Sequence, residues 1–480
     1  QSGVTVVVPS VAGSLDSSAS VVLSGPLAQY GSRFGGMVAP AGDVDGDELP
    51  DLLVTNATEQ MPSKDSWPGW PSDVDADGAA ACDLGYEAHT GSVRLYRGVA
   101  DGKLSGSPAA VIYPEELWLP GEDEALSRHV VVAGDFDYDG DGHADVAVAQ
   151  PKRPGPDGAQ YGGRVALYRG GVLGEKTQVI CAADATFNAG PGTFFLGAAM
   201  APVGDLDGDG CDEIAVSAPG SAVNTPVPEI PWDGRVYVLY GFGEGCSHPM
   251  ARVASLHVDF PMSGFGFSLD GSADIDGDGL RDLLVSAPFF LVGAARFGAA
   301  FIVKGSTLKN APMSEGVDGI LGVMPEAEIL PVDLNAPTLI RSPESTSGDV
   351  PPSTSLPPAP EAVEIPLFGY QVAYVAGIGD HGFGVAVGTP NRHQGATYDV
   401  GEMRLYRWTD LLTPKGKHLA LRGVFIGQSW KPGSRLGHAL TSGTWMGVPT
   451  VVVGGPGGDP KNVTGQVDNG AVYLLPIASE

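Results

Sequence analysis

The chain has 480 residues with 70 Gly and 40 Pro, and only 18% of its residues are charged, so it is rich in turns and lacks sustained helical periodicity. A formal net charge of −30 argues against a nucleic-acid-binding protein, because no basic surface is available to neutralise phosphates. The sequence contains no apolar run of about 18 residues and therefore predicts no membrane-spanning helix. A start at Gln1 without a signal peptide indicates a processed mature form.

Two short segments rich in β-branched residues open the chain, at residues 4–8 and 19–24. Segments of this length and composition are typical of strands. We therefore expect two strands ahead of the first repeat.

One acidic pattern then occurs four times, at residues 43–51, 137–145, 205–213 and 274–282, here called the first to fourth acidic loops. Carboxylates occupy positions 1, 3, 5 and 9 of each loop, and the main-chain carbonyl of position 7 is expected to face the same centre. Calcium takes six to eight oxygen ligands at about 2.3–2.6 Å, and alternating Asp and Gly supply them within a tight turn. A solvated acidic turn would explain one copy, but four copies in one sequence context predict four calcium ions.

The ligands predicted for these ions are Asp43, Asp45, Asp47, Leu49 and Asp51 in the first loop, Asp137, Asp139, Asp141, His143 and Asp145 in the second, Asp205, Asp207, Asp209, Cys211 and Glu213 in the third, and Asp274, Asp276, Asp278, Leu280 and Asp282 in the fourth.

The acidic loops share their surroundings. A short apolar segment, usually with Phe-Gly or Leu-Gly, precedes each loop, and a short apolar strand follows it. After a variable stretch comes a strand that starts at Gly, as at residues 163–168 and 234–240. Two later units, at 368–406 and 436–473, keep this frame without the acidic loop. Six units with period-2 patterning and turn residues between them predict an all-β fold, a β-propeller.

The order Phe-Gly, Asp-x-Asp-Gly-Asp-Gly-x-x-Asp, Ala-Pro and Gly-x-Val-Tyr resembles the FG-GAP repeat. Over nearly the whole chain the sequence is similar to the calcium-binding propeller at the head of integrin α-subunits. The resemblance implies a single β-propeller domain over residues 1–480. Integrin heads have seven repeats and only six are countable here, so we expect six blades, with seven as the alternative.

Closure of the ring is also predicted. The last unit ends with its third strand near residue 475, and segment 19–24 stands where the missing fourth strand belongs. We expect this N-terminal strand to complete the last blade. Segment 4–8 is then an extra edge strand, part of a degenerate seventh blade, or an arm that pairs with another chain.

Two insertions interrupt the repeats. Residues 58–90 enlarge a loop of the first blade. They place three carboxylates at EF-hand-like spacing with a fourth beyond, which predicts either a fifth calcium site or an acidic surface loop. The residues concerned are Asp73, Asp75, Asp77 and Asp83. Residues 306–366 contain a Pro/Ser-rich tract, 342–360, which is typical of an extended or disordered excursion.

Four cysteines suit a secreted, oxidised protein, although buried free thiols are the alternative. In a propeller, Cys211 in the third acidic loop and Cys246 after the third strand of the same blade lie on one face. Cys82 in the first insertion and Cys181, taken as the end of the outer strand of the second blade, lie toward the other face. This placement predicts the disulfides Cys82–Cys181 and Cys211–Cys246.

No catalytic residue is predicted, because no catalytic motif stands out and the clustered acidic residues are assigned to calcium. A secreted hydrolase or lyase remains an alternative, as does a structural subunit of a surface polymer or filament that self-associates through the N-terminal strand. The favoured hypothesis is a calcium-stabilised propeller, secreted or at the cell surface, that acts in adhesion by binding a protein or glycan.

The partner is expected on the face opposite the acidic loops, where aromatic side chains are typical interface anchors. Alternatively, these rings plug a central channel or pack within their own loops. The residues are Trp67, Trp70, Tyr161, Trp232, Phe289 and Phe290.

Overall fold

The structure is a computed structural model of the whole chain. It describes residues 4–7, 10–11, 14–15, 21–24, 34–56, 91–100, 103–113, 130–155, 161–171, 173, 178–180, 183–221, 232–249, 251–292, 295–296, 298–311, 314–315, 320–321, 329–331, 339–341, 367–393, 399–413, 417–426, 433–445, 448–456 and 471–477.

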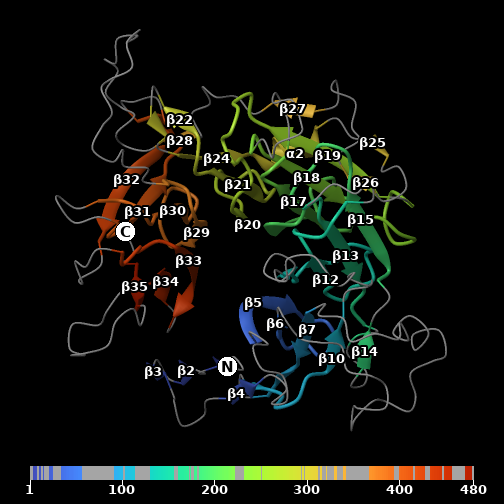
Figure 1. Cartoon of the computed structure of the whole chain (residues 1–480). Coiled ribbons are helices and arrows are strands. Elements are labelled where there is room, and N and C mark those ends of the chain that lie inside the picture. Colours follow the sequence, from blue (N-terminus) through green and yellow to red (C-terminus); the bar gives the residue numbers. More distant parts are fainter. Residues whose placement is uncertain are drawn as a thin grey trace. The chain divides into compact units, whose positions relative to one another are not determined.

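The fold is an all-β β-propeller of six blades, as predicted, and each blade is an antiparallel sheet whose core strands follow one another along the chain (Figure 1). The blades are β5(Phe34–Gly42)–β6(Asp51–Asn56)–β7(Ser92–Tyr96)–β10(Ala110–Ile112), β11(Val131–Ala133)–β12(Val146–Ala149)–β13(Arg164–Tyr168)–β15(Ala185–Ala189), β16(Met200–Gly204)–β17(Glu213–Ala218)–β18(Arg235–Tyr240)–β19(Arg252–His257), β20(Leu269–Ala273)–β21(Asp282–Ala287)–β24(Ala299–Val303)–β28(Leu339–Arg341), β29(Val372–Ala376)–β30(Phe383–Thr389)–β31(Glu402–Trp408)–β32(Leu419–Phe425) and β33(Ala439–Trp445)–β34(Val448–Gly455)–β35(Ala471–Pro476).

Short two-stranded sheets accompany the blades: β1(Val4–Val7) with β4(Val21–Ser24), β2(Ser10–Val11) with β3(Ser14–Leu15), β8(Gly98–Val99) with β9(Lys103–Leu104), and β22(Leu291–Val292) with β23(Ala295–Arg296). Among the described residues, α2 (Gly305–Lys309) is the only helix. By its internal packing the chain divides into two compact units, residues 1–216, 237–253 and 313–328, and residues 217–236, 254–312 and 329–480.

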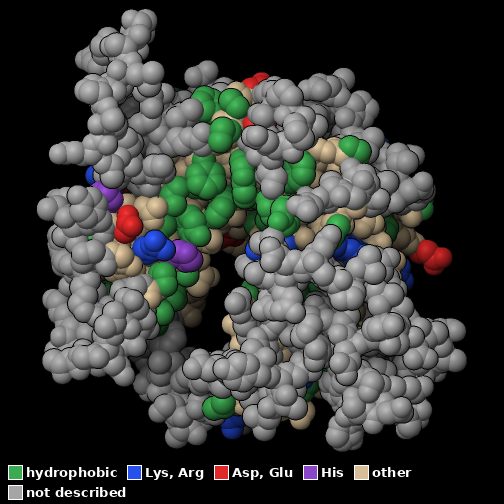
Figure 2. Space-filling model, viewed as in Figure 1, with side chains coloured by type: hydrophobic (Ala, Val, Ile, Leu, Met, Phe, Trp, Pro, Cys, Tyr) green, Lys and Arg blue, Asp and Glu red, His purple; other side chains and the backbone are tan. Residues whose placement is uncertain are grey.

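Neighbouring blades share their cores. In the first unit, Leu53 of blade 1 and Val148 of blade 2 belong to one buried cluster. In the second unit, one cluster joins Leu284 of blade 4 to Val385 of blade 5, and another joins blade 5 to Val451 of blade 6. Figure 2 shows hydrophobic side chains gathered over β20, β21 and β24 of blade 4. The period-2 pattern of the strands therefore serves to bury apolar side chains between blades.

The N-terminal strand differs from the expectation. β4 pairs antiparallel with β1, from Val4 opposite Ser24 to Val7 opposite Val21, instead of adding to the last blade. Two β-branched segments close in sequence pair at a small cost in loop-closure entropy, which favours this local hairpin. β4 belongs to the first compact unit and the last blade to the second, so completion of the last blade by this strand stays a prediction.

Two further strand assignments change. The segment taken as the outer strand of blade 2, β14 (Gln178–Ile180), pairs in parallel with β10 of blade 1, and β15 is the fourth strand of blade 2. The 306–366 insertion also contributes strands to blades. Its strands β25 (Ser314–Glu315) and β27 (Ile329–Pro331) pair with β19, β26 (Ile320–Leu321) pairs with β15, and β28 pairs with β24. The Pro/Ser-rich tract itself lies outside the described residues.

The glycine that opens the third strand of a blade has a packing reason. Gly298 has φ of +87°, and a Cβ there would overlap the carbonyl oxygen of Phe368, from the Phe-Gly of the next blade. Gly234 makes the same close approach to Phe265. The two halves of the repeat motif, Phe-Gly and Gly-x-Val-Tyr, therefore meet at the junction between neighbouring blades.

Replacing Gly298 by Ala is expected to lower the free energy of unfolding by about 1–3 kcal/mol, because Ala disfavours this backbone conformation and its Cβ has no room. Gly106→Ala is the matched control, since Gly106 is exposed and a Cβ there would meet nothing within 4 Å. Denaturant unfolding of both variants measures the difference. Equal stability of the two would contradict this account of the motif.

Candidate metal centres

Each acidic loop joins the first strand of its blade to the second, in blades 1 to 4. Position 1 shapes the turn. In the first loop, Asp43 Oδ1 accepts hydrogen bonds from the amides of Gly46 and Asp47, at 2.8 and 3.0 Å, and its Oδ2 accepts one from Glu48 at 2.8 Å. The same three bonds recur at the other position-1 residues, Asp137, Asp205 and Asp274.

Position 9 ties the loop to its blade. In the second loop, Asp145 is fully buried, and its two carboxylate oxygens accept hydrogen bonds of 2.7 Å from the amides of Tyr138, at position 2, and Gly170, which follows the third strand. The corresponding residues Asp51, Glu213 and Asp282 bond in the same way. This carboxylate therefore fixes the loop, the second strand and the end of the third strand together.

In the first, second and fourth loops, the position-3 carboxylate has one buried oxygen free of protein hydrogen bonds. Asp139 is 7% exposed; its Oδ2 lies 2.9 Å from Arg169 Nε, and its Oδ1 is buried without a hydrogen-bond partner. Asp45 with Arg97 and Asp276 with Lys304 repeat this arrangement. The third loop differs: Asp207 Oδ2 lies 3.8 Å from His248 Nε2, and its Oδ1 accepts a hydrogen bond of 3.2 Å from the amide of Asp209. A buried carboxylate oxygen without a partner is costly, and a cation at the centre of the loop satisfies it.

Carboxylate oxygens of the predicted ligands do come together. Three carboxylates in each loop place an oxygen within 4.8 Å of the others: Asp43, Asp45 and Asp47; Asp137, Asp139 and Asp145; Asp205, Asp207 and Asp209; and Asp274, Asp276 and Asp282. Hard oxygens of this kind suit calcium. At position 7 the amides of Leu49, His143, Cys211 and Leu280 each donate to the position-5 carboxylate. Coordination by these side chains and by the position-7 carbonyls is a proposal, taken up below.

Burial changes the acidity of the position-9 carboxylates. It raises the pKa of Asp51 to about 6, of Asp282 to about 7, of Asp145 to about 8 and of Glu213 to about 9, against the lowering effect of their backbone hydrogen bonds. Without a cation, Asp145 and Glu213 would hold protons at neutral pH, Asp282 would be about half protonated, and Asp51 would be mostly charged. A bound cation favours the charged form instead.

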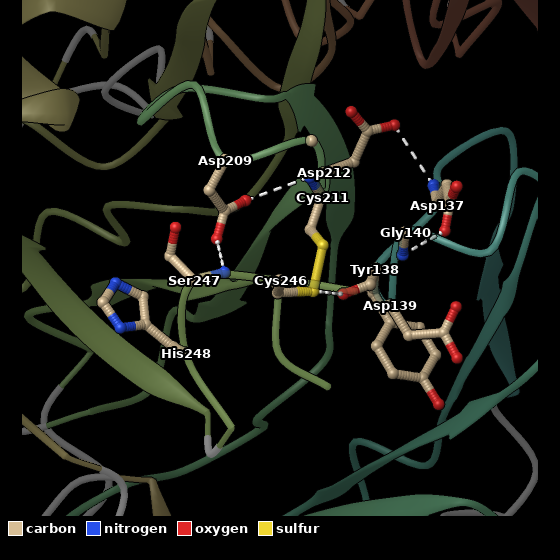
Figure 3. Close-up of a disulfide and its surroundings, with 12 residues drawn as sticks. Asp137, Tyr138, Asp139, Gly140, Asp209, Cys211, Asp212, Cys246, Ser247 and His248 are labelled. Atoms are coloured by element: carbon tan, nitrogen blue, oxygen red, sulfur yellow. Dashed lines mark hydrogen bonds between the residues drawn. A yellow bond between two sulfur atoms is a disulfide. The ribbon is translucent and has the colours of Figure 1, made fainter. Parts of the chain in front are cut away.

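The third acidic loop carries a disulfide between Cys211 at position 7 and Cys246, with an S–S distance of 2.04 Å (Figure 3). This pairing confirms the one predicted from the sequence. Cys82, Cys181 and the candidate fifth site at Asp73, Asp75, Asp77 and Asp83 lie outside the described residues. The predictions made for them stand untested.

Blade 5 shows how a loop holds together without the acidic pattern. Asp380 Oδ1 lies 3.2 Å from Arg407 Nη2, and its Oδ2 accepts a hydrogen bond of 2.8 Å from the amide of Asp410. His381 Nε2 lies 2.6 Å from Asp410 Oδ1. The hydrogen bond from the amide of Asp410, more than the nearby Arg407, lowers the pKa of Asp380. The Arg407 guanidinium here lies against the loop carboxylate, where a metal ion is expected in the acidic loops.

Sequence reasoning missed the basic partners of position 3. Arg97, Arg169 and Lys304 each follow the third strand of a blade directly, and Arg407 is the second-last residue of the third strand in blade 5. The signal was present as a recurrent Tyr-Arg or Val-Lys step at the end of that strand. It was not used because nothing local in the sequence shows that the third strand ends beside the loop.

The described aromatic residues predicted to contact a partner have different surroundings. Tyr161 stacks on Phe195 with ring centroids 5.5 Å apart. Trp232 packs edge-on against Phe289 at 6.3 Å, and both are half-buried. Phe290 does not fit the expectation of a partner contact, because it is 4% exposed and packs in the core. Its ring centroid lies 4.7 Å from that of Phe260 and 5.7 Å from that of Phe301. Trp67 and Trp70 lie outside the described residues.

Comparisons with known proteins agree with the repeat pattern. The family model of the FG-GAP repeat matches residues 197–239 and 265–303, which hold the third and fourth acidic loops. The chain carries FG-GAP repeats, and integrin α subunits are its homologues. Integrin alpha-IIb of Homo sapiens is 31% identical over 294 residues, which cover 56% of this chain and 25% of the relative.

Other integrin relatives match shorter stretches. Integrin alpha-IIb of Mus musculus is 33% identical over 220 residues, 40% of this chain and 20% of the relative. Integrin alpha-10 of Homo sapiens is 34% identical over 154 residues, 32% of this chain and 12% of the relative. The matched part of the chain thus spans a quarter or less of the length of these relatives. Within the described residues, no helix has the length and apolar character needed to cross a membrane.

The raised pKa values predict that calcium stabilises the protein more as pH rises. The position-9 carboxyls have pKa values near 4 in the unfolded chain and of about 6 to 9 in the folded state without divalent cations. Between these pH values the folded state binds more protons than the unfolded chain. The free energy of unfolding therefore falls as pH rises through that range. Calcium replaces those protons. The gap in melting temperature between calcium-saturated and cation-depleted protein should widen from about pH 5 to about pH 8. A constant gap would contradict the prediction.

Position 3 gives a second prediction. Asp45→Asn should remove one bound calcium ion, because Asp45 carries the buried oxygen that faces the centre of the first loop. Glu48→Gln is the matched control, as Glu48 is an exposed residue of the same loop and its side chain is not a predicted ligand. Isothermal titration calorimetry should give one ion fewer for Asp45→Asn and an unchanged number for Glu48→Gln. Equal stoichiometry in the two variants would count against the assignment.

Proposed function

We propose that the chain is an extracellular propeller, stabilised by four calcium ions in its acidic loops, that binds a protein partner in adhesion. The observation that carries the calcium part is the position-3 carboxylate of the first, second and fourth loops, with one oxygen near a basic side chain and the other buried without a partner. The homology to integrin α subunits supports an adhesion or ligand-binding role. The Cys211–Cys246 disulfide supports an oxidising, extracellular location.

The second unit offers a surface for that partner. A row of half-buried rings runs from Trp232 through Phe289, Phe267 and Tyr370 to His438, with successive centroids 6.3, 5.9, 4.9 and 4.9 Å apart. Phe267 precedes β20 and Phe289 follows β21, whereas the fourth acidic loop joins the other ends of these two strands. The row thus lies at the end of blade 4 opposite the acidic loop, on the face where the partner was expected.

The row has the properties of an interface anchor. Its members are large, and their mutual packing restricts their rotamers, so little side-chain entropy remains to be lost on binding. Rings that are already half-buried still offer apolar area to a partner, and aromatic residues of this kind dominate the energetics of many interfaces. Phe267, Tyr370 and His438 extend the predicted anchors Trp232 and Phe289 into blades 5 and 6.

The role in adhesion is tested by measuring binding of the purified chain to a panel of extracellular matrix and cell-surface proteins, with calcium and after its removal. Calcium-dependent, saturable binding to a defined protein supports the proposal. Absence of binding to any protein, together with turnover of a polysaccharide or phospholipid substrate, would favour the enzyme alternative instead.

Replacing Phe267 and Tyr370 together by Ala should weaken binding of such a partner by about 2–4 kcal/mol if the row is the anchor. Val472→Ala together with Leu474→Ala is a control, because these apolar side chains are 66% and 43% exposed on β35 and belong to a different part of the surface. Surface plasmon resonance on variants that still melt cooperatively gives the affinities. Wild-type affinity in the Phe267/Tyr370 variant would move the site away from the row.

A further inference from the structure

Segment 241–248, which follows β18, contacts every functional position of the third acidic loop except the first. The amide of Gly241 donates to Glu213 Oε1 at 3.4 Å, and the amide of Ser247 donates to Asp209 Oδ2 at 2.7 Å. His248 Nε2 lies 3.8 Å from Asp207 Oδ2, and Cys246 is bonded covalently to Cys211. The segment therefore touches positions 3, 5, 7 and 9 of one candidate metal centre.

The same segment packs on the second acidic loop (Figure 3). The carbonyl oxygen of Tyr138, at position 2 of that loop, accepts a hydrogen bond of 2.9 Å from the amide of Phe242 and lies 3.4 Å from Cys246 Sγ. The backbone of Gly245 lies so close to Asp139 that a Cβ on Gly245 would come within 2.5 Å of its carbonyl oxygen. One short segment thus contacts two neighbouring metal centres.

The two loops also contact each other directly. The amide of Asp212, in the third loop, donates to the carbonyl oxygen of Asp137 at 2.6 Å, and the amide of Asp137 donates to Asp212 Oδ2 at 3.1 Å. The Gly140 backbone of the second loop faces Cys211, since a Cβ there would lie 2.9 Å from Cys211 Sγ. Any movement of the disulfide therefore displaces both loops.

The junction between the first and second loops provides an internal comparison. The amide of Ala144 donates to the carbonyl oxygen of Asp43 at 2.9 Å, and the amide of Gly171 donates to that of Val44 at 2.7 Å. These two bonds correspond to those that the amides of Asp212 and Phe242 donate at the junction between the second and third loops. Position 7 of the second loop is His143, however, whose ring packs on Gly46 without a covalent bond. The disulfide is therefore an added constraint on a junction that is otherwise of the same kind.

We propose that segment 241–248, held by the disulfide, couples the second and third acidic loops. Calcium bound at one loop then raises the calcium affinity of the other. Reduction of Cys211–Cys246 lowers the calcium affinity of both loops. This inference rests on the proposed binding of calcium by the acidic loops. The coupling follows because a cation in either loop orders the same segment. The first ion to bind loses the conformational entropy of that segment, and the second ion binds to a segment that is already ordered.

The reductive step requires a dithiol, either a small molecule or a protein. Its thiolate attacks Cys246 Sγ, which is partly exposed, and displaces the Cys211 thiolate, which is buried. The second thiol of the reductant then attacks the mixed disulfide. Two cysteine thiols form, and the dithiol is oxidised to its disulfide, so two electrons and two protons pass to the protein.

The test follows hydrogen exchange of the four loop segments, 43–51, 137–145, 205–213 and 274–282, as a function of calcium concentration. In the double variant Cys211→Ala, Cys246→Ala, the calcium midpoint for protection of 137–145 and 205–213 should rise about fivefold or more, which is the lower end of ordinary coupling between sites. The midpoint for 274–282 should not change, because the fourth loop belongs to the other compact unit and its carboxylates bond to residues of blade 4. If the double variant does not fold, the oxidised and dithiol-reduced native chains are compared in the same way.

Coupling is measured separately with Asp207→Asn, which removes a predicted ligand from the third loop only. The midpoint for 137–145 should rise in this variant and stay unchanged in the control Asp276→Asn, which alters the fourth loop. An unchanged midpoint for 137–145 in Asp207→Asn, or an equal shift of all four segments in the cysteine variant, overturns the inference. A failure of all four segments to respond to calcium overturns the proposed calcium binding itself.

Discussion

Burial of carboxylates inside a nine-residue turn is the constraint on which the rest of blades 1 to 4 depends. In the second loop, Asp145 joins the loop, the second strand and the end of the third strand through two backbone hydrogen bonds, and it does so fully buried. Asp137 and Asp139 bring further negative charge within 4.8 Å. Such a group is stable only if protons or a cation neutralise it. The raised pKa of Asp145 corresponds to neutralisation by a proton, and the unpartnered oxygen of Asp139 fits neutralisation by a cation.

A basic residue at the end of the third strand is common to blades 1, 2 and 4, which have the acidic pattern, and to blade 5, which lacks it. Arg169 lies against Asp139 in blade 2, and Arg407 lies against Asp380 in blade 5. One arginine can offset only part of the charge of an acidic loop, which leaves room for a divalent cation. The loop of blade 5 has fewer carboxylates. Arg407 lies against Asp380, and His381 lies against Asp410. A loop with fewer acidic residues therefore needs no cation to offset their charge.

Features fixed by neighbours in sequence could be predicted, and features fixed by distant partners could not. The acidic loops and the six blades follow from local spacing and alternation, and the Cys211–Cys246 disulfide follows from the order of strands within one blade. The pairing of β14 with blade 1 and of β4 with β1 depends on which free edge each strand reaches, and its own residues do not encode that. Phe289 and Phe290 are adjacent and chemically equal, so only the fold decides that Phe290 is the buried one.

The fourth acidic loop and the aromatic row are linked by a single buried strand. Asp282 at position 9 of the loop is the first residue of β21, every residue of β21 is buried, and Phe289 follows its last residue closely. A close-packed strand transmits displacement along its length, because its side chains have no free volume to absorb it. If the fourth loop binds calcium as proposed, loss of the ion would leave the Asp282 carboxylate to be neutralised by a proton, which weakens the hydrogen bonds that it accepts from Ile275 and Gly305 at this end of β21. The rings at the other end would then lose part of their rigidity. Under the proposed function, a cation that touches no partner would in this way contribute to the affinity for one.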